Sequence, residues 1–202
     1  MGKCIILCAG GFDGLLEKPT KNDYIIAADG GYRHALTLGI TPDCILGDFD
    51  SLGYVPEGAN VFPVEKDDTD AMLSVRHGLK LGYRDFVIYG GMEGDRVDHT
   101  VANLQTLLYL KENGASGLLA GKKQLATVIR NEDLPLPNRK NGTVSVFAMG
   151  GKAEGVTIKG LYYEAENISL TPGFPLGVSN HFTGKDAAIS VTDGTLLVIY
   201  DR

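Results

Sequence analysis

Two aspartates stand two residues apart at the point where an apolar run ends. The run is Cys44-Ile45-Leu46, and residues 47–51 after it read GDFDS. In an extended chain Asp48 and Asp50 point to the same side, so their charges share a small volume. Like charges that close repel one another unless a cation lies between them. The pair therefore indicates either a divalent-metal site or a turn in which each aspartate accepts hydrogen bonds from nearby backbone N–H groups.

Further acidic clusters occur in the same half of the chain. The motif ADGG contains Asp29, EKDDTDA is a loop before a helical segment, and GGMEGDRVDH follows another apolar run. The chemically capable residues in the last two motifs are Lys66, Asp67, Asp68, Thr69, Asp70, Asp95, Arg96, Asp98 and His99. Ligands of open α/β sheets bind outside the carboxyl ends of the strands, and every cluster falls at that predicted edge. Their coincidence favours a shared site over an isolated turn.

Individual members of these clusters also have structural explanations. Asp68 or Thr69 is a suitable N-cap for the next helix, and Asp70 in its first turn is favoured by the helix dipole. Asp98 is likewise a candidate N-cap, and Arg96 is a candidate ion-pair partner for it. These alternatives stay open for each residue taken singly.

A metal-bound polyphosphate is the ligand that fits the residue types taken together. Magnesium takes carboxylate and phosphate oxygens, and the remaining phosphate charge attracts cations such as Lys66 and Arg96. Glycine pairs at the strand ends let the backbone approach a bulky ligand closely. The sequence contains neither GxxxxGK[ST] nor GxGxxG, so these common phosphate loops are excluded. His99 and Asn103, four residues apart, share a helix face, although a lone histidine there is more often a packing or surface residue.

The elements that must position these residues alternate between strand and helix. Short continuous apolar runs predict buried strands at 4–9, 24–29, 44–46 and 85–90. Apolar residues at helical spacing predict helices at 69–81 and 98–113. Continuous rather than alternating apolar strands are typical of parallel sheets, so the first half is expected to be an α/β domain with right-handed crossovers.

The second half of the chain has no helical period. Short segments rich in β-branched and aromatic residues follow one another and predict an all-β module, a small sandwich or barrel. TDGT at 192–195 predicts a hairpin with an Asp-Gly turn, and EDLPLPNRKNG at 132–142 is expected to be a loop. The predicted domains are therefore 1–123 and 124–202.

Charge and cysteine content narrow the function classes. The 202-residue chain has a formal net charge of −6, which argues against a nucleic-acid partner but allows a phosphate ligand that arrives with a metal cation. Cys4, Cys8 and Cys44 are odd in number and lie in apolar runs, so they are expected to be buried thiols in a reducing compartment. The first apolar run is too short for a signal sequence or a membrane span, and a cytoplasmic location is expected.

The motifs ADGG, GDFDS, EKDDTDA and GDRVDHTVANL occur in one order, followed by GLYY and LGVSN in the tail. In this combination the chain closely resembles thiamine pyrophosphokinases over nearly its whole length. The resemblance implies a Rossmann-like α/β catalytic domain that binds ATP and magnesium, followed by a β-sandwich domain that binds thiamine. It implies transfer of a diphosphate group from ATP to the thiamine hydroxyl, with AMP leaving. It also implies a homodimer with active sites at the subunit interface. The net charge and the short first apolar run lead us to expect no nucleic-acid or membrane partner.

The resemblance also implies roles for the matching residues. Asp48, Asp50 and Asp70 would hold magnesium and polyphosphate, and together with Asp98 they would form the catalytic set. The residues implied to bind ATP are Asp29, Lys66, Thr69, Arg96, His99 and Asn103. The residues implied to bind thiamine are Gly160, Leu161, Tyr162, Ser179 and Asn180. In one departure, the family often has Gly-Gly-Arg where this chain has Gly94-Asp95-Arg96, which adds a negative charge beside the expected phosphates.

Two other function classes compete with this interpretation. A glycosyltransferase could use the Asp48–Asp50 pair on a nucleotide sugar, but the additional KDDTD and RVDH clusters and the short chain count against it. A non-catalytic thiamine or nucleotide sensor would keep the same binding residues, so sequence disfavours it only weakly. An assay with ATP, magnesium and thiamine that resolves AMP from ADP separates all three.

Overall fold

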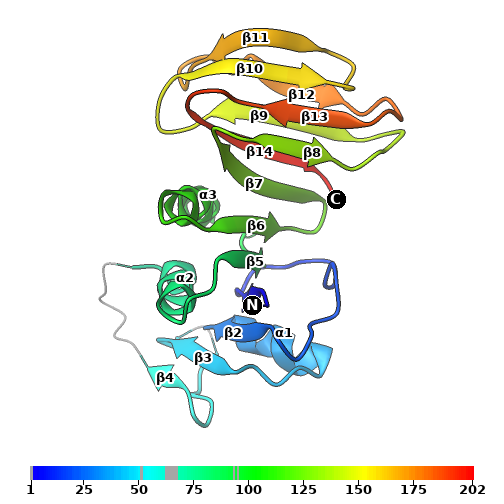
Figure 1. Ribbon diagram of the computed structural model, residues 1–202. Coiled ribbons are helices and arrows are strands. Elements are labelled where there is room, and N and C mark those ends of the chain that lie inside the picture. The colour runs from blue at the N-terminus through cyan, green and yellow to red at the C-terminus, as the bar shows by residue number, and fades with distance from the viewer. Residues whose placement is uncertain (1, 51, 62–67, 93, 95) are drawn as a thin grey trace. The chain divides into compact units, whose positions relative to one another are not determined.

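The computed structural model describes residues 2–50, 52–61, 68–92, 94 and 96–202 (Figure 1). The chain packs into two compact units, Met1–Lys123 and Gln124–Arg202, which we call the first and the second unit. The first unit combines strands with helices, whereas the described residues of the second contain strands and no helix. The predicted combination of an α/β domain with a β-rich domain is confirmed.

Parallel strands form the sheet of the first unit. They are β1 (Cys4–Leu7), β2 (Tyr24–Ala28), β3 (Cys44–Gly47), β4 (Asn60–Val61), β5 (Asp85–Tyr89) and β6 (Ser116–Ala120). Their lateral order is β6-β5-β1-β2-β3-β4, and each neighbouring pair is parallel. The order reverses between β1 and β5, because β5 lies on the side of β1 away from β2. In open α/β sheets such a reversal leaves a crevice at the carboxyl ends of the strands.

Helices cover both faces of this sheet. They are α1 (Gly31–Leu38), α2 (Asp70–Lys80) and α3 (Val97–Glu112). α1 connects β2 to β3, whereas α2 and α3 lead to β5 and β6 in the opposite lateral direction. Right-handed crossovers therefore place α1 on one face and α2 with α3 on the other, as Figure 1 shows. The turns that enter all three helices consequently lie at the carboxyl edge of the sheet.

The central strands β1, β2 and β5 are buried on both faces, as their continuous apolar runs predict. Ile6, Ile26, Phe86 and Ile88 are fully buried. Gly78 lets α2 pack directly on the sheet, because a Cβ there would lie 2.7 Å from the ring of Phe86. A core packed this tightly fixes the strand ends, and with them the turns that carry the acidic clusters.

The second unit contains two antiparallel sheets. One has the order β12-β9-β14-β7 and consists of β7 (Gln124–Arg130), β9 (Thr143–Ala148), β12 (Gly177–His181) and β14 (Thr195–Asp201). The other has the order β11-β10-β13-β8 and consists of β8 (Asp133–Leu136), β10 (Ala153–Lys159), β11 (Ala165–Leu170) and β13 (Ala187–Ser190). One hydrophobic cluster includes Val146 and Leu196 from the first sheet and Val156 and Ile189 from the second. The two sheets therefore share one core.

Two sequence predictions for this unit are wrong. The strands that flank TDGT, β13 and β14, lie in different sheets, so the motif is no hairpin. Its turn is fixed from outside instead: the Glu154 N–H donates to the Asp193 carbonyl at 2.7 Å, and the Gly194 N–H donates to Asn131 Oδ1 at 2.8 Å. The predicted loop at 132–142 contains β8, which includes Pro135. Because β8 is an edge strand, a proline is tolerated there.

Candidate metal and phosphate site

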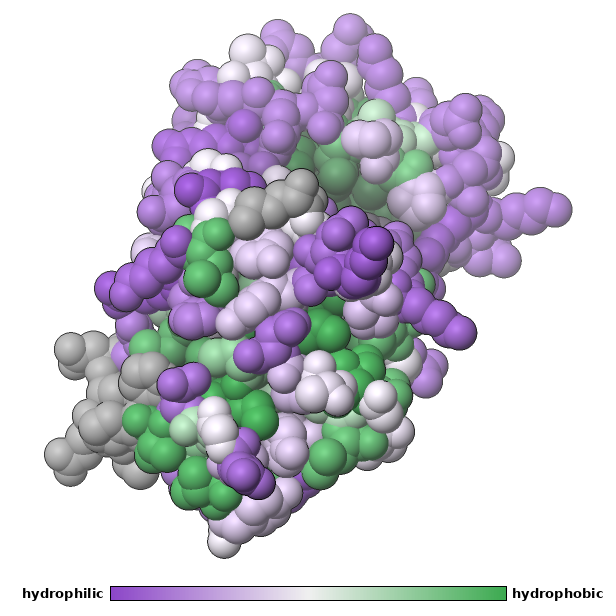
Figure 2. All heavy atoms as spheres, turned by 60° about the horizontal axis from the view of Figure 1, so that its bottom comes forward, coloured by the Kyte–Doolittle hydropathy of each residue, from purple (hydrophilic) through white to green (hydrophobic). Residues whose placement is uncertain are grey.

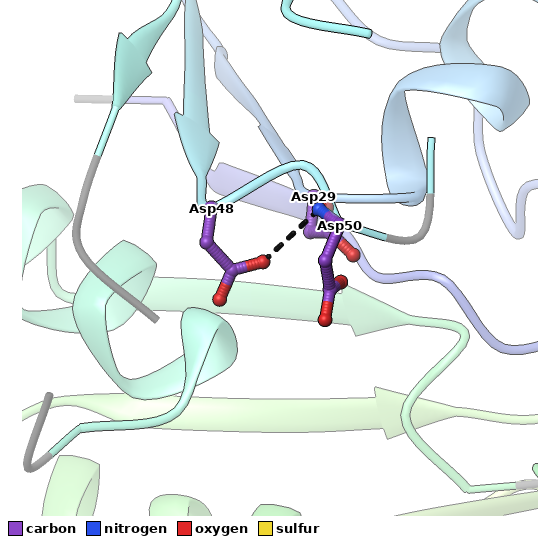
Figure 3. Close-up of side chains that lie close together, drawn as sticks. All are labelled: Asp29, Asp48 and Asp50. Atoms are coloured by element: carbon purple, nitrogen blue, oxygen red, sulfur yellow. Dashed lines mark hydrogen bonds between the residues drawn. The ribbon is translucent and has the colours of Figure 1, made fainter. Parts of the chain in front are cut away.

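Three carboxylates converge at the carboxyl ends of β2 and β3. One oxygen each from Asp29, Asp48 and Asp50 lies within 4.8 Å of the others (Figure 3). Asp29 is buried, Asp48 is half-buried and Asp50 is exposed, so the group opens to solvent on one side. Carboxylates this close repel one another, whereas a hard divalent cation would bind their oxygens together. The donor set and its spacing therefore fit magnesium.

Backbone geometry explains how the sequence brings these three side chains together. Phe49 lies between the two aspartates with a positive φ of 60° and is only 3% exposed, so its burial turns both neighbours outward. Asp29 also has a positive φ, 45°, and its N–H donates to the Leu46 carbonyl at 2.8 Å. A Cβ on Gly47 would lie 3.0 Å from the Asp29 Cα. Glycine at 47 therefore allows the ends of β2 and β3 to come into contact.

The turn predicted as the alternative at this motif also exists. The Asp50 N–H donates to Asp48 Oδ1 at 3.3 Å, which is drawn in Figure 3. This contact orients the Asp48 carboxylate within the group rather than away from it. The turn and the carboxylate group are thus two aspects of one local structure.

The loop before α2 contains the predicted helix cap. Thr69 Oγ1 accepts a hydrogen bond from the Met72 N–H at 3.2 Å, and Asp70 occupies the first turn. Asp68 accepts a hydrogen bond from Arg76 Nη1 at 2.6 Å. Asp70 is not a member of the carboxylate group, but its charge acts on Cys8 after β1. Burial and, secondarily, Asp70 raise the pKa of the Cys8 thiol to about 12.

Arg96 and Asp98 form an ion pair at the start of α3. Arg96 Nη2 donates to Asp98 Oδ2 at 2.7 Å and Nε donates to Oδ1 at 3.3 Å. The hydrogen bond from Arg96 is the main cause that lowers the pKa of Asp98, and the His99 N–H adds a further hydrogen bond to Oδ1 at 3.0 Å. Both partners are exposed. The candidate ion pair is therefore confirmed, and a role of these residues in nucleotide binding stays a prediction.

Asn103 acts on the loop after β5. Its Nδ2 donates to the Gly91 carbonyl at 2.8 Å, and the side chain is buried. One turn earlier, Thr100 Oγ1 donates to the Met92 carbonyl at 2.8 Å. These contacts indicate that Asn103 positions the loop after β5 through its backbone. The spacing of Asn103 from His99 did not reveal this role.

The residues matched to a thiamine site lie in the second unit. Tyr162 and Tyr163 are exposed, 68% and 62%, and their rings meet edge to face with centroids 4.8 Å apart. Leu161 is buried, and the Gly160 φ of 74° brings its backbone against Asp186. Figure 2 shows one face of the molecule, on which hydrophobic residues reach the surface among hydrophilic ones. An exposed aromatic pair marks a candidate binding surface.

Ser179 and Asn180 belong to β12, and Asn180 contacts the backbone of the aromatic pair. Asn180 is 5% exposed, and its Oδ1 accepts hydrogen bonds from the N–H groups of Tyr163 at 2.9 Å and His181 at 2.8 Å. Ser179 has a positive φ of 61° and its N–H donates to Ser145 Oγ at 3.1 Å. The contacts of Asn180 are those of a residue that shapes the tyrosine loop.

Several residues named from the sequence lie outside the described residues, namely Ser51, Lys66, Asp67 and Asp95. Sequence reasoning assigned Asp29 to the nucleotide and missed its place in the carboxylate group. The available signal was that Asp29 and Asp48 follow consecutive predicted strands of one parallel sheet. In the described part of the chain, no helix is long and apolar enough to cross a membrane.

Comparison with known proteins gives matches for both units. The family model "Thiamin pyrophosphokinase, catalytic domain" matches residues 16–116, and "Thiamin pyrophosphokinase, vitamin B1 binding domain" matches residues 129–196. The chain is 25% identical to thiamine pyrophosphokinase of Bacillus subtilis over 210 residues, with 98% of each chain covered. It is 27% identical to thiamin pyrophosphokinase 1 of Caenorhabditis elegans over 194 residues, covering 89% of this chain and 79% of the relative.

Solved structures agree in fold. The crystal structure of the Bacillus subtilis thiamine pyrophosphokinase superposes with a TM-score of 0.87 at 22% identity, covering 98% of both chains. Thiamin pyrophosphokinase from Candida albicans gives a TM-score of 0.78 at 15% identity, covering 99% of this chain and 88% of the other. At these identities the structural likeness demonstrates the fold alone.

Proposed function

The chain belongs to the thiamin pyrophosphokinase family, and on this premise we propose the reaction of its site. The enzyme transfers the diphosphate group of ATP to the hydroxyl of thiamine and releases thiamine diphosphate and AMP. The observation that carries this proposal is the group formed by Asp29, Asp48 and Asp50 at the carboxyl edge of the sheet. It lies within the segment matched by the catalytic family model.

Magnesium is the proposed metal, held by Asp48 and Asp50 with Asp29 beside them. When bound, it neutralises charge on the phosphate oxygens and aligns them for attack. The chain's own contribution is preorganisation, because the buried Phe49 and the Asp50–Asp48 hydrogen bond fix the carboxylates before any ligand arrives. Asp70, Thr69 and the Arg96–Asp98 pair are proposed to surround the nucleotide from the starts of α2 and α3. Together with His99, Asn103 and Lys66, they complete the proposed ATP-binding set.

Thiamine is proposed to bind at the tyrosine pair of the second unit. Its thiazolium ring is a cation, and aromatic faces attract cations. Exposed rings at Tyr162 and Tyr163 offer such faces, and Asn180 holds the loop that presents them. Gly160, Leu161 and Ser179 are proposed to shape the same surface through their backbone conformation.

Two finer descriptions of the protein accompany this proposal. The first unit is proposed to be Rossmann-like and the second sandwich-like, supported by the strand order and by the shared core of two sheets. The protein is proposed to act in the cytoplasm as a homodimer, supported by the family resemblance. Nucleic acid and membrane are not among the proposed partners.

A single assay tests the proposed reaction. Purified protein is supplied with ATP, magnesium and thiamine, and the nucleotide products are separated. AMP and thiamine diphosphate in equal amounts are expected. ADP with thiamine monophosphate would indicate another kinase, and tight thiamine binding without turnover would favour the sensor.

A further inference from the structure

The turn after β1 is held by contacts with the residues that follow β5 and with α1. It comprises Gly10, Gly11 and Phe12, and we call it the switch-point turn because it lies where the strand order reverses between β1 and β5. The Gly10 N–H donates to the Gly90 carbonyl at 3.0 Å, and His34 Nε2 lies 3.0 Å from the Gly10 carbonyl oxygen. The Phe12 ring packs against His34 from α1, with centroids 4.8 Å apart. This turn is therefore fixed before a ligand binds.

Glycine is required on both sides of this contact. A Cβ on Gly10 would lie 2.4 Å from the Gly90 carbonyl oxygen, and a Cβ on Gly90 would lie 2.4 Å from the Gly10 carbonyl oxygen. The two backbones thus touch with no side chain between them. Bare backbone at a strand end is a surface that a phosphate can approach closely.

One cation lies directly over this bare surface. Lys122 follows β6, yet its side chain extends past β5 to the end of β1. A Cβ on Gly11 would lie 2.5 Å from Lys122 Cε and 2.8 Å from its Nζ. Within the part of the chain that the structure describes, Lys122 forms no ion pair. Among the described residues, no partner accounts for the position of this ammonium group at a glycine turn, in a protein of net charge −6.

The lateral strand order separates this cation from the carboxylates. Lys122 lies over the end of β1, and Asp29, Asp48 and Asp50 follow β2 and β3 on the next strands. A polyphosphate laid along this edge therefore meets the carboxylate-held metal at one end and the lysine at the other. Thiamine is excluded as the partner of Lys122, because both are cations.

Resting on the proposed function, we infer that Lys122 binds the nucleotide through its α-phosphate, the one that stays on AMP. In the reaction the thiamine oxygen bonds to the β-phosphorus and its proton passes to a carboxylate of the site or to water, while the bond between that phosphorus and the bridging oxygen breaks. The bridging oxygen leaves on AMP with the electron pair. The negative charge on the AMP phosphate therefore increases during transfer. The lysine ammonium group, a compact positive charge with three N–H donors, stabilises that charge.

The test compares Lys122→Gln with Lys123→Gln, which removes the same charge one residue away. The wild type is first assayed for AMP and thiamine diphosphate, so failure of the proposed reaction is seen separately. Lys122→Gln is expected to raise the KM for ATP and the inhibition constant of AMP about 10- to 100-fold, the loss for one charge-assisted hydrogen bond. The KM for thiamine, the inhibition by adenosine and the melting temperature should be unchanged. Lys123→Gln should behave as the wild type.

A second variant moves the lysine without removing its charge. The backbone at Gly11 is not left-handed, so alanine can adopt it without strain. The Cβ of Gly11→Ala would displace only the flexible end of the Lys122 side chain. Gly11→Ala should weaken ATP and AMP binding, as Lys122→Gln does. The double variant Gly11→Ala/Lys122→Gln should bind ATP and AMP no more weakly than Lys122→Gln alone. Unchanged ATP and AMP constants in Lys122→Gln, or equal losses in Lys123→Gln, would overturn the assignment. Additive effects in the double variant would do the same.

Discussion

The side chain of Asn180 and the backbone of Tyr163 form a closed pair of hydrogen bonds. Asn180 Nδ2 donates to the Tyr163 carbonyl at 2.7 Å, and Asn180 Oδ1 accepts the Tyr163 N–H at 2.9 Å. These bonds, with the one from the His181 N–H, occupy Oδ1 and one hydrogen of Nδ2, so the amide mainly fixes the tyrosine loop. Asn180 therefore positions the tyrosine loop, and its role as a thiamine ligand stays a prediction.

Asn180→Ala should therefore loosen the loop and destabilise the fold at once. The change leaves buried backbone groups without their partner, which costs about 1–3 kcal/mol of the free energy of unfolding. The KM for thiamine should rise while the KM for ATP stays constant. Denaturant unfolding and steady-state kinetics check both effects, with the exposed Asn138→Ala as control. A rise in the KM for thiamine without any loss of stability would instead indicate that Asn180 contacts thiamine directly.

Asp29→Asn should weaken magnesium binding, although the family resemblance assigns this residue to ATP. Asparagine tolerates a positive φ, so the backbone at 29 can stay as it is. Turnover in Asp29→Asn, Asp48→Asn and Asp50→Asn should fall about 100-fold or more, because each loses a charge that holds the metal. Magnesium-dependent stabilisation in thermal melts without nucleotide gives a readout independent of activity. Glu57→Gln, an exposed carboxylate outside the group, is the control; an unchanged magnesium response in Asp29→Asn would exclude that residue from the site.

Thr69→Ala separates the cap from any contact with the nucleotide. Loss of the bond to the Met72 N–H should cost about 1 kcal/mol of stability. Thr69→Ser keeps the hydroxyl and should recover that stability. If the cap is the whole role of Thr69, the KM for ATP recovers in parallel. A KM that stays raised in Thr69→Ser would instead indicate that the methyl group contacts the nucleotide.

The buried thiols of Cys4 and Cys8 should make the free energy of unfolding depend on pH. Burial raises the pKa of both Cys4 and Cys8 to about 12, against 9.0 for an unperturbed thiol. Their folded-state values exceed the unfolded ones, so their contribution to stability is complete below pH 9 and is lost as the pH rises towards 12. Unfolding free energies measured between pH 7 and pH 10.5 should decline, and the decline should be smaller in Cys4→Ala/Cys8→Ala. Native protein at pH 8 should also resist alkylation at these two positions.

Mixing two inactive variants tests the proposed homodimer. Asp48→Asn impairs the first unit, and Tyr162→Ala impairs the second. If each site combines the first unit of one subunit with the second unit of its partner, random mixing restores about a quarter of the wild-type activity. The mixture is assayed after subunit exchange has been verified by size and labelling. Absence of recovery would mean that each chain builds its site alone.

Much of the first unit follows from local signals in the sequence. Continuous apolar runs identify β1, β2, β3 and β5, and parallel pairing then brings their acidic ends to one edge. The membership of Asp29 in the carboxylate group did not follow, because it depends on Gly47 allowing close contact between two strand ends. The position of Lys122 was missed for a similar reason. A long side chain that reaches across a neighbouring strand cannot be inferred from the spacing of residues along the sequence.

The second unit was less predictable because its pairing is non-local. The Asp-Gly turn at 193–194 has the composition of a hairpin, but its two flanking strands find partners in separate sheets. Turn composition reports the local backbone and says nothing of which strands pair. β8 was hidden by Pro135, since a proline in an apolar run usually argues against a strand.

The proline in β8 also affects how the folded protein behaves among its own copies. β8 is an edge strand of four residues, and Pro135 offers no amide hydrogen to a strand arriving from outside. An edge so short and so poor in donors is a weak template for intermolecular β-pairing. Replacing Pro135 by valine would complete the row of donors, and the protein would then be expected to precipitate at concentrations at which the natural chain stays dispersed.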